Sequence, residues 1–163
     1  MFNDPEWATE EEWNAYAWFG FAVSEAQILE RQLAILATAF AIQSQKGGNQ
    51  ESGWLELYDK HGRLTLGRLL RKIERFLDAE LVIDLRCIVE LRNELAHEFF
   101  WPRNQGINDP DPTPEESIKK LAAIASKFRS VSSRLEPTID EFIRKHGLDK
   151  KTVTEEAKRQ TSH

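Results

Sequence analysis

Several features that identify common protein classes are scarce or absent in this chain of 163 residues. Its single cysteine excludes an intrachain disulfide and any zinc site built from several cysteines. Its longest dense apolar stretch, Leu33 to Ile42, is far shorter than the roughly 20 residues that cross a bilayer. The first twelve residues carry acids and no base, unlike a secretory signal peptide. We therefore expect a cytoplasmic protein with no membrane partner.

The usual signatures of cofactor and metal chemistry are missing too. The sequence has no phosphate-binding Walker loop, no Gly-x-Ser-x-Gly elbow and no His-Glu-x-x-His pair. Glu94 to His97 matches one Glu-x-x-His unit of the di-iron bundles, but such a site needs a second copy. We expect no cofactor and no metal. The length predicts one domain, residues 1–148, followed by a polar, exposed tail over 149–163.

The net charge of −5 is unevenly distributed along the chain. Residues 1–60 hold ten acids and three bases, whereas bases slightly outnumber acids in the remainder. The middle and end of the chain are therefore not generally repulsive to phosphate, and the overall charge does not exclude a nucleic-acid partner.

Helix start and stop signals dominate the sequence, and strand signals are almost absent. Thr9 with Glu12 and Thr113 with Glu116 form capping boxes, and Asp78 can cap a helix between them. The patterns predict long helices over about 10–45, 66–77, 79–100 and 114–147, the last kinked or interrupted at Pro137, and one or two helical turns over 54–60. The predicted fold is an all-α antiparallel four-helix bundle.

The third predicted helix carries one anomaly. At about 100° per residue, a polar stripe of Arg86, Glu90, Asn93 and His97 lies opposite an apolar arc. The arc consists of Leu81, Leu85, Ile88, Val89, Leu91, Leu95 and Ala96. Arg92 lies in the middle of this arc, where a guanidinium must find a partner or face a second surface. An ordinary salt bridge with another helix and a functional role both stay open.

The segment Arg92-Asn93-Glu94-Leu95-Ala96-His97 resembles the signature of the HEPN superfamily (higher eukaryotes and prokaryotes nucleotide-binding domains). That signature has an arginine, usually a polar residue next, and a histidine four to six residues beyond the arginine at the end of a bundle helix. Residues 98–100 and 65–70 also look like segments of bacterial members. The resemblance is sharp over about ten residues.

The resemblance implies a metal-independent endoribonuclease that leaves 2′,3′-cyclic phosphate ends, of the kind found as toxins in toxin–antitoxin or phage-defence systems. His97 would transfer protons, because histidine is the side chain that titrates nearest neutrality. Arg92 would bind the phosphoryl oxygens, and Asn93 would position the phosphate or hold the imidazole. Residues five apart on a helix diverge by about 140°, so the site needs local unwinding or a homodimer, and HEPN nucleases are characteristically dimers.

One position departs from the pattern. HEPN toxins silenced by a nucleotidyltransferase antitoxin often have a tyrosine two residues after the histidine, which accepts AMP. Here that residue is Phe99, which has no hydroxyl, although other antitoxin partners stay open. Some members are non-catalytic, and the mannitol-operon repressors are helical regulators with a comparable Arg…His stretch. The alternative function is therefore a non-catalytic interaction or regulatory module.

Two further groups of side chains have alternative interpretations. Four cations recur at helical spacing on the second helix, where they form either an RNA-binding face or an ordinary solvated face: Arg68, Arg71, Lys72 and Arg75. An aromatic cluster near the start of the first helix is either part of the core or a protein-binding patch: Trp7, Trp13, Tyr16, Trp18, Phe19 and Phe21.

Overall fold

The computed structural model describes residues 9–44, 50–97, 99 and 112–145, and all regular secondary structure in these ranges is helical. The all-α prediction is confirmed. The elements are α1 (Glu10–Ser44), α2 (Gln50–Gly62), α3 (Leu66–Ile73), the short 3₁₀ helix η1 (Glu74–Phe76), α4 (Ala79–His97) and α5 (Pro114–Lys145). None of the described helices is long and apolar enough to span a membrane. The tail predicted for 149–163 lies outside the described residues.

Local capping signals fix where three helices begin. The Thr9 amide donates to Glu12 Oε2 at 2.6 Å, and the Glu12 amide donates back to Thr9 Oγ1 at 3.2 Å. Thr113 and Glu116 make the same reciprocal pair at the start of α5. The Leu81 amide donates to Asp78 Oδ1 at 2.8 Å at the start of α4. All three caps are as predicted, because each depends only on residues three apart.

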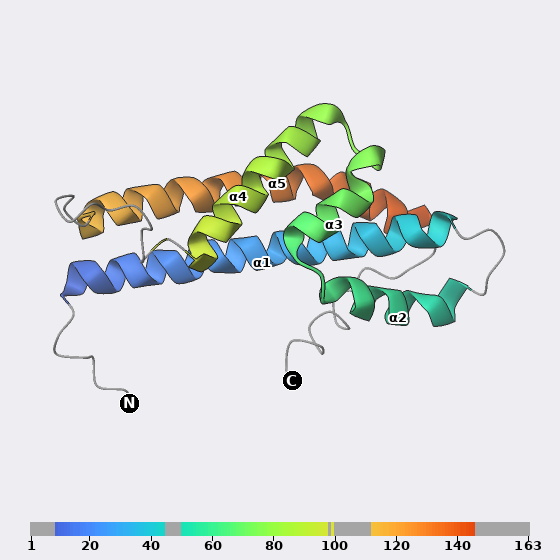
Figure 1. Ribbon diagram of the computed structural model, residues 1–163, viewed down its shortest axis with the longest axis horizontal. Coiled ribbons are helices and arrows are strands. Elements are labelled where there is room, and N and C mark those ends of the chain that lie inside the picture. The colour runs from blue at the N-terminus through green and yellow to red at the C-terminus, as the bar shows by residue number, and fades with distance from the viewer. Residues whose placement is uncertain (1–8, 45–49, 98, 100–111, 146–163) are drawn as a thin grey trace.

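The helix count and one helix direction differ from the prediction. The segment expected to form one or two turns is the 13-residue helix α2. The chain reverses direction at each connection between its five α-helices. The first helix, α1, and the last, α5, are therefore parallel (Figure 1). Contacts agree, since Glu25 pairs with Arg129 and Gln32 with the Ser132 carbonyl further along both helices. The expected antiparallel relation between the first and last long helices is therefore wrong.

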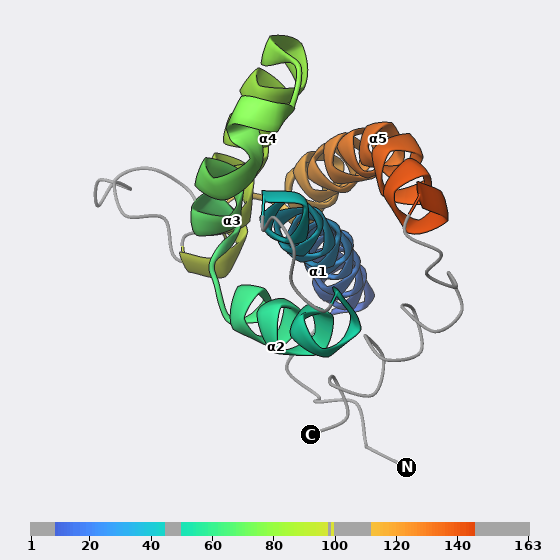
Figure 2. The ribbon, with the colours of Figure 1, turned by 90° about the vertical axis from the view of Figure 1, so that its right-hand side faces the viewer.

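Helix α1 is the central element of the molecule. In the end-on view of Figure 2 it lies between α5 on one side and α2, α3 and α4 on the others. Small buried side chains let the neighbouring backbones approach closely: Ala22, Ala26, Ala34, Ala37 and Ala39. Larger fully buried residues fill the space around them: Leu29, Leu33, Leu36, Leu69, Ile73, Leu85, Ile88, Leu121, Phe128 and Leu135. Most of the apolar core is thus built around one helix.

Helix α5 continues through Pro137, so of the predicted kink or interruption at this residue the interruption is absent. A proline inside a helix removes one backbone hydrogen bond and costs about 3 kcal/mol. Leu135, Ile139 and Phe142 on either side of it are buried. Their packing offsets this cost and holds the helix together across the proline.

A buried polar pair attaches α2 to α1. The Thr38 hydroxyl donates to the Ala34 carbonyl at 2.8 Å, so its single proton is engaged there. His61 Nδ1 lies 2.9 Å from the same oxygen and must therefore be the donor. Burial, with the positive charges of Lys72 and Lys60, lowers the pKa of His61. The imidazole is thus held neutral, with its proton on Nδ1.

This lowered pKa predicts a pH-dependent stability. Because the unfolded chain binds the His61 proton more tightly than the folded one, stability is fully present above about pH 6.5 and is lost as the pH falls. Urea unfolding at pH 7.5 and 5.5 should show a loss of up to about 1 kcal/mol more for the wild type than for His61→Gln, whose amide can still donate to Thr38. Equal losses in the two proteins would contradict the prediction.

Candidate functional site

The exposed stripe predicted along α4 is present. Arg86, Glu90, Asn93 and His97 are all exposed, and Arg86 pairs with Glu74 on η1 at 3.0 Å. On the opposite arc Leu81, Leu85, Ile88 and Leu95 are buried, and Val89 and Leu91 are half-buried. Ala96 differs from the prediction, because it is exposed in the last turn. The last two turns of α4 thus present polar side chains outward and Leu95 inward.

Arg92 forms an ion pair with Glu30 on α1. Its Nε donates to Glu30 Oε1 at 2.8 Å, and the two side chains are 31% and 27% exposed. The Glu30 carboxylate therefore binds the Nε–H group of Arg92, the inner edge of the guanidinium next to the side-chain stem. The two terminal amino groups have no partner among the described residues and stay available for a second oxyanion.

A pocket of about 280 Å³ opens beside this ion pair, and we call it the Arg92 pocket. Helix α4 contributes Arg92, Leu95 and Ala96 to its wall. The α1 wall consists of Phe19, Val23, Ala26, Gln27 and Glu30. The pocket thus combines an apolar wall with one guanidinium, the arrangement typical of small-ligand sites.

Five contacts hold the end of α4 and the adjacent Phe99 in place. Leu95 is buried in the core, and Arg92 is paired with α1 as described. Glu94 forms an ion pair with Lys120 on α5. Phe99 lies 5.8 Å from the Phe19 ring, centroid to centroid, and Lys120 lies over the Phe99 ring at 5.9 Å. The position of Arg92 is therefore fixed from α1 and α5 together.

The structure brings Arg92 to α1 but leaves His97 on a different face. Helix α4 stays helical through His97, so the five-residue separation keeps its divergence of about 140°. Local unwinding, one of the two solutions considered for uniting the pair, is absent within the described part of α4. Asn93 is exposed on the same side as His97. Within one chain, these three residues do not converge on one point.

The cationic stripe of the second predicted helix lies on α3 and η1. All four members are exposed, opposite the buried face of α3: Arg68, Arg71, Lys72 and Arg75. The Arg75 guanidinium lies over the Phe76 ring at 4.5 Å. None of these four side chains belongs to the lining given above for the Arg92 pocket. The arrangement fits a solvated face, and an RNA-binding role for it stays a prediction.

The aromatic cluster on α1 is largely outside the core. Four of its rings are between 37% and 42% exposed: Trp13, Tyr16, Trp18 and Phe21. They pair edge to face as Trp13 with Tyr16 and Trp18 with Phe21. Phe19 packs against the core and Phe99, and Trp7 lies outside the described residues. Of the two interpretations, the exposed patch describes the four rings better than core packing.

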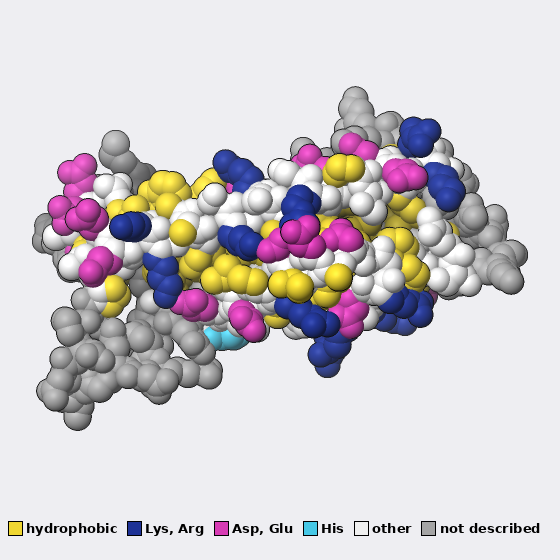
Figure 3. Space-filling view, turned by 90° about the horizontal axis from the view of Figure 1, so that it is seen from above, with side chains coloured by type: hydrophobic (Ala, Val, Ile, Leu, Met, Phe, Trp, Pro, Cys, Tyr) yellow, Lys and Arg dark blue, Asp and Glu magenta, His cyan; other side chains and the backbone are white. Residues whose placement is uncertain are grey.

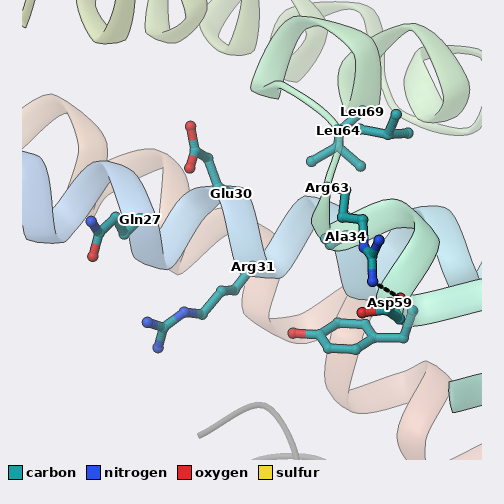
Figure 4. Close-up of a pocket in the computed structure, with 10 residues that line it drawn as sticks. Gln27, Glu30, Arg31, Ala34, Asp59, Arg63, Leu64 and Leu69 are labelled. Atoms are coloured by element: carbon teal, nitrogen blue, oxygen red, sulfur yellow. Dashed lines mark hydrogen bonds and ion pairs between the residues drawn. The ribbon is translucent and has the colours of Figure 1, made fainter. Parts of the chain in front are cut away.

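The sequence reasoning missed Glu30 and its neighbour Arg31. They are adjacent charged residues in the otherwise apolar second half of α1. A charged side chain on a central helix has to be paired or to face an opening in the structure. Their position in that segment was the available signal. Figure 4 shows that they leave α1 on opposite sides.

Among the described residues, no three His, Cys, Asp or Glu side chains gather as metal ligands. Comparison of the chain with protein-family models, with curated proteins and with solved structures gives no match. The interpretation of the site therefore rests on its residues and geometry.

The Arg92–Glu30 pair makes a testable contribution to stability. A double-mutant cycle with Glu30→Gln and Arg92→Gln should give a coupling of about 0.5–1 kcal/mol in urea unfolding, because both side chains are about two-thirds buried. The exposed Asp59–Arg63 pair, at 2.8 Å and four residues apart, joins the last turn of α2 to the residue that follows the helix. It is the matched control and should give about 0.3–0.5 kcal/mol. A coupling for Arg92–Glu30 no larger than that of the control would show that the pair does not fix the guanidinium.

Proposed function

We propose that the chain is a HEPN-type, metal-independent endoribonuclease with a HEPN-like helical fold, acting as a homodimer. The observation that carries the proposal is Arg92: Glu30 binds the guanidinium through Nε, and its terminal amino groups, beside a pocket, have no partner within the described ranges of the chain. Asn93 and His97 are exposed at the end of the same helix, on a face away from the Arg92–Glu30 pair.

The proposed reaction is an internal transfer at one RNA phosphate. The 2′-oxygen attacks phosphorus, its proton passes to a basic group, and the bond to the 5′-oxygen breaks as that oxygen gains a proton. The products are a 2′,3′-cyclic phosphate and a free 5′-hydroxyl. His97 transfers protons, Arg92 stabilises the charge on the pentacoordinate phosphorus, and Asn93 positions the phosphate.

In the proposed two-fold dimer, Arg92 of one copy and His97 of the other lie at the same site, which one chain alone does not allow. Because α4 is helical to its last residue, the His97 that acts with a given Arg92 comes from the second copy. Light scattering at micromolar concentration should therefore give the mass of two chains. A monomer would count against the composite site.

Substitutions at the site should separate chemistry from positioning. With total RNA in EDTA, His97→Ala and Arg92→Ala should lower cleavage by about 10²–10⁴-fold, the range for losing one acid–base or charge-stabilising group. Glu30→Gln should lower the rate by about tenfold, because a neutral amide oxygen binds the Nε–H group of Arg92 more weakly than the carboxylate and positions the guanidinium less well. Glu90→Ala and Arg86→Ala, on the same stripe, are the controls and should cleave at the wild-type rate. RNA with the 2′-hydroxyl replaced should stay intact.

Circular dichroism and thermal unfolding establish that each variant is folded. Cleavage by folded His97→Ala at the wild-type rate, or no cleavage of varied RNAs by a folded wild-type dimer, would reject the nuclease. The surviving proposal would then be the second candidate.

That second candidate is a non-catalytic interaction or regulatory module with the same fold. It is favoured by the four partly exposed aromatic rings on α1, since tryptophan and tyrosine are common interface anchors. A toxin partnered by an antitoxin would use such a patch while keeping the nuclease site. The two candidates are therefore distinguished by cleavage alone.

A further inference from the structure

A second pocket, of about 410 Å³, is drawn in Figure 4, and it shares two lining residues of α1 with the Arg92 pocket. We call it the Arg31 pocket. It is bounded by α1, by the end of α2, by the connection between α2 and α3, and by Leu69 of α3. Ala34, Leu64 and Leu69 give it an apolar surface, and its volume lies in the range of small-ligand sites.

The lining of the Arg31 pocket holds two carboxylates and two guanidinium groups. Both carboxylates are already paired with arginines: Glu30 with Arg92, which is not part of this lining, and Asp59 with Arg63. Arg31 is half-buried and has no carboxylate partner among the described residues. An uncompensated guanidinium in a concave site favours an anionic ligand.

Tyr58 adds a neutral donor to the same wall. The residue is 8% exposed, and its ring stacks on Trp54 at 6.4 Å between centroids. Burial raises the pKa of its phenol, while the nearby charge of Arg31 opposes this, so the hydroxyl keeps its proton at neutral pH. Its hydroxyl makes no hydrogen bond with a described residue. Arg31, Tyr58 and the Gln27 amide thus provide donors above an apolar surface.

The two pockets are neighbours along α1. Gln27 and Glu30 line both of them, and the α1 residues that line one pocket or the other extend from Phe19 to Ala34, a rise of about 22 Å. A ligand that extends through both pockets would meet Arg92 first and Arg31 next. Repeated phosphates joined by flat, partly apolar units have this alternation, whereas a lone inorganic anion would leave the apolar surface empty.

We propose that the Arg31 pocket binds one nucleotide of a single-stranded RNA next to the phosphate at Arg92, with its phosphate on Arg31 and its sugar and base against Tyr58 and Leu64. This inference rests on the proposed function, because it takes Arg92 as the phosphate-binding group of the reaction.

Binding of a non-cleavable RNA tests the inference without any cleavage step. The probe is a fluorescent five-nucleotide RNA with 2′-O-methyl groups throughout, titrated with the full chain and followed by anisotropy. Arg31→Gln should weaken binding by tenfold or more, because it removes a charge-assisted contact. Arg144→Gln makes the same charge change at an exposed position on α5 and should stay within twofold of wild type. Tyr58→Phe keeps the ring and should weaken binding by two- to fivefold.

Three comparisons separate this inference from the nuclease and from a simple anion site. His97→Ala should bind the probe as tightly as wild type, so Arg31-dependent binding by a chain that never cleaves RNA would reject the nuclease and keep the pocket. Inorganic phosphate should compete far more weakly than a mononucleotide. Equal competition, no saturable binding by wild type, or equal affinities of folded Arg31→Gln and Arg144→Gln would each overturn the nucleotide site.

Discussion

The structure depends on the burial of one long helix by all the others. Helix α1 contacts α2, α3, α4 and α5, and its buried alanines set how closely they approach. A central helix of this kind must be apolar on nearly every side, so any charge on it has to be paired or face an opening. The adjacent residues Glu30 and Arg31 meet this requirement in opposite ways. Glu30 is paired with α4, and Arg31 faces a pocket.

This arrangement links the proposed chemistry to the fold. The carboxylate that neutralises Arg92 belongs to the central helix, so the ion pair positions the guanidinium relative to the element against which α4 packs. A phosphate at Arg92 would displace no described side chain from the terminal amino groups. Preorganisation of this kind lets a cation stabilise developing charge without reorganising when the reaction occurs.

What the sequence allowed us to predict was local. The capping pairs at Thr9 and Thr113 join residues three apart, and the exposed stripe on α4 follows from helical period alone. Helix α2 was underestimated because its anchor, Trp54, packs against Phe142 on α5, far away in the sequence. For the same reason the sequence does not predict that Glu30 pairs with Arg92, which lies 62 residues further along the chain. Interactions set by tertiary packing leave only an indirect trace in a single sequence, here a charge in an apolar segment.

The parallel course of α1 and α5 has an electrostatic consequence for the whole molecule. Two side-by-side helices that point the same way place both positive ends of their macrodipoles together, which is unfavourable unless negative charge is added there. Five exposed carboxylates lie in the first turns of the two helices: Glu10, Glu11, Glu12, Glu115 and Glu116. Figure 3 shows acidic side chains, in magenta, gathered at the left end of the molecule. The described part of the molecule therefore carries one strongly anionic pole, and a polyanion approaching it is turned away from this end toward the flanks of the helices.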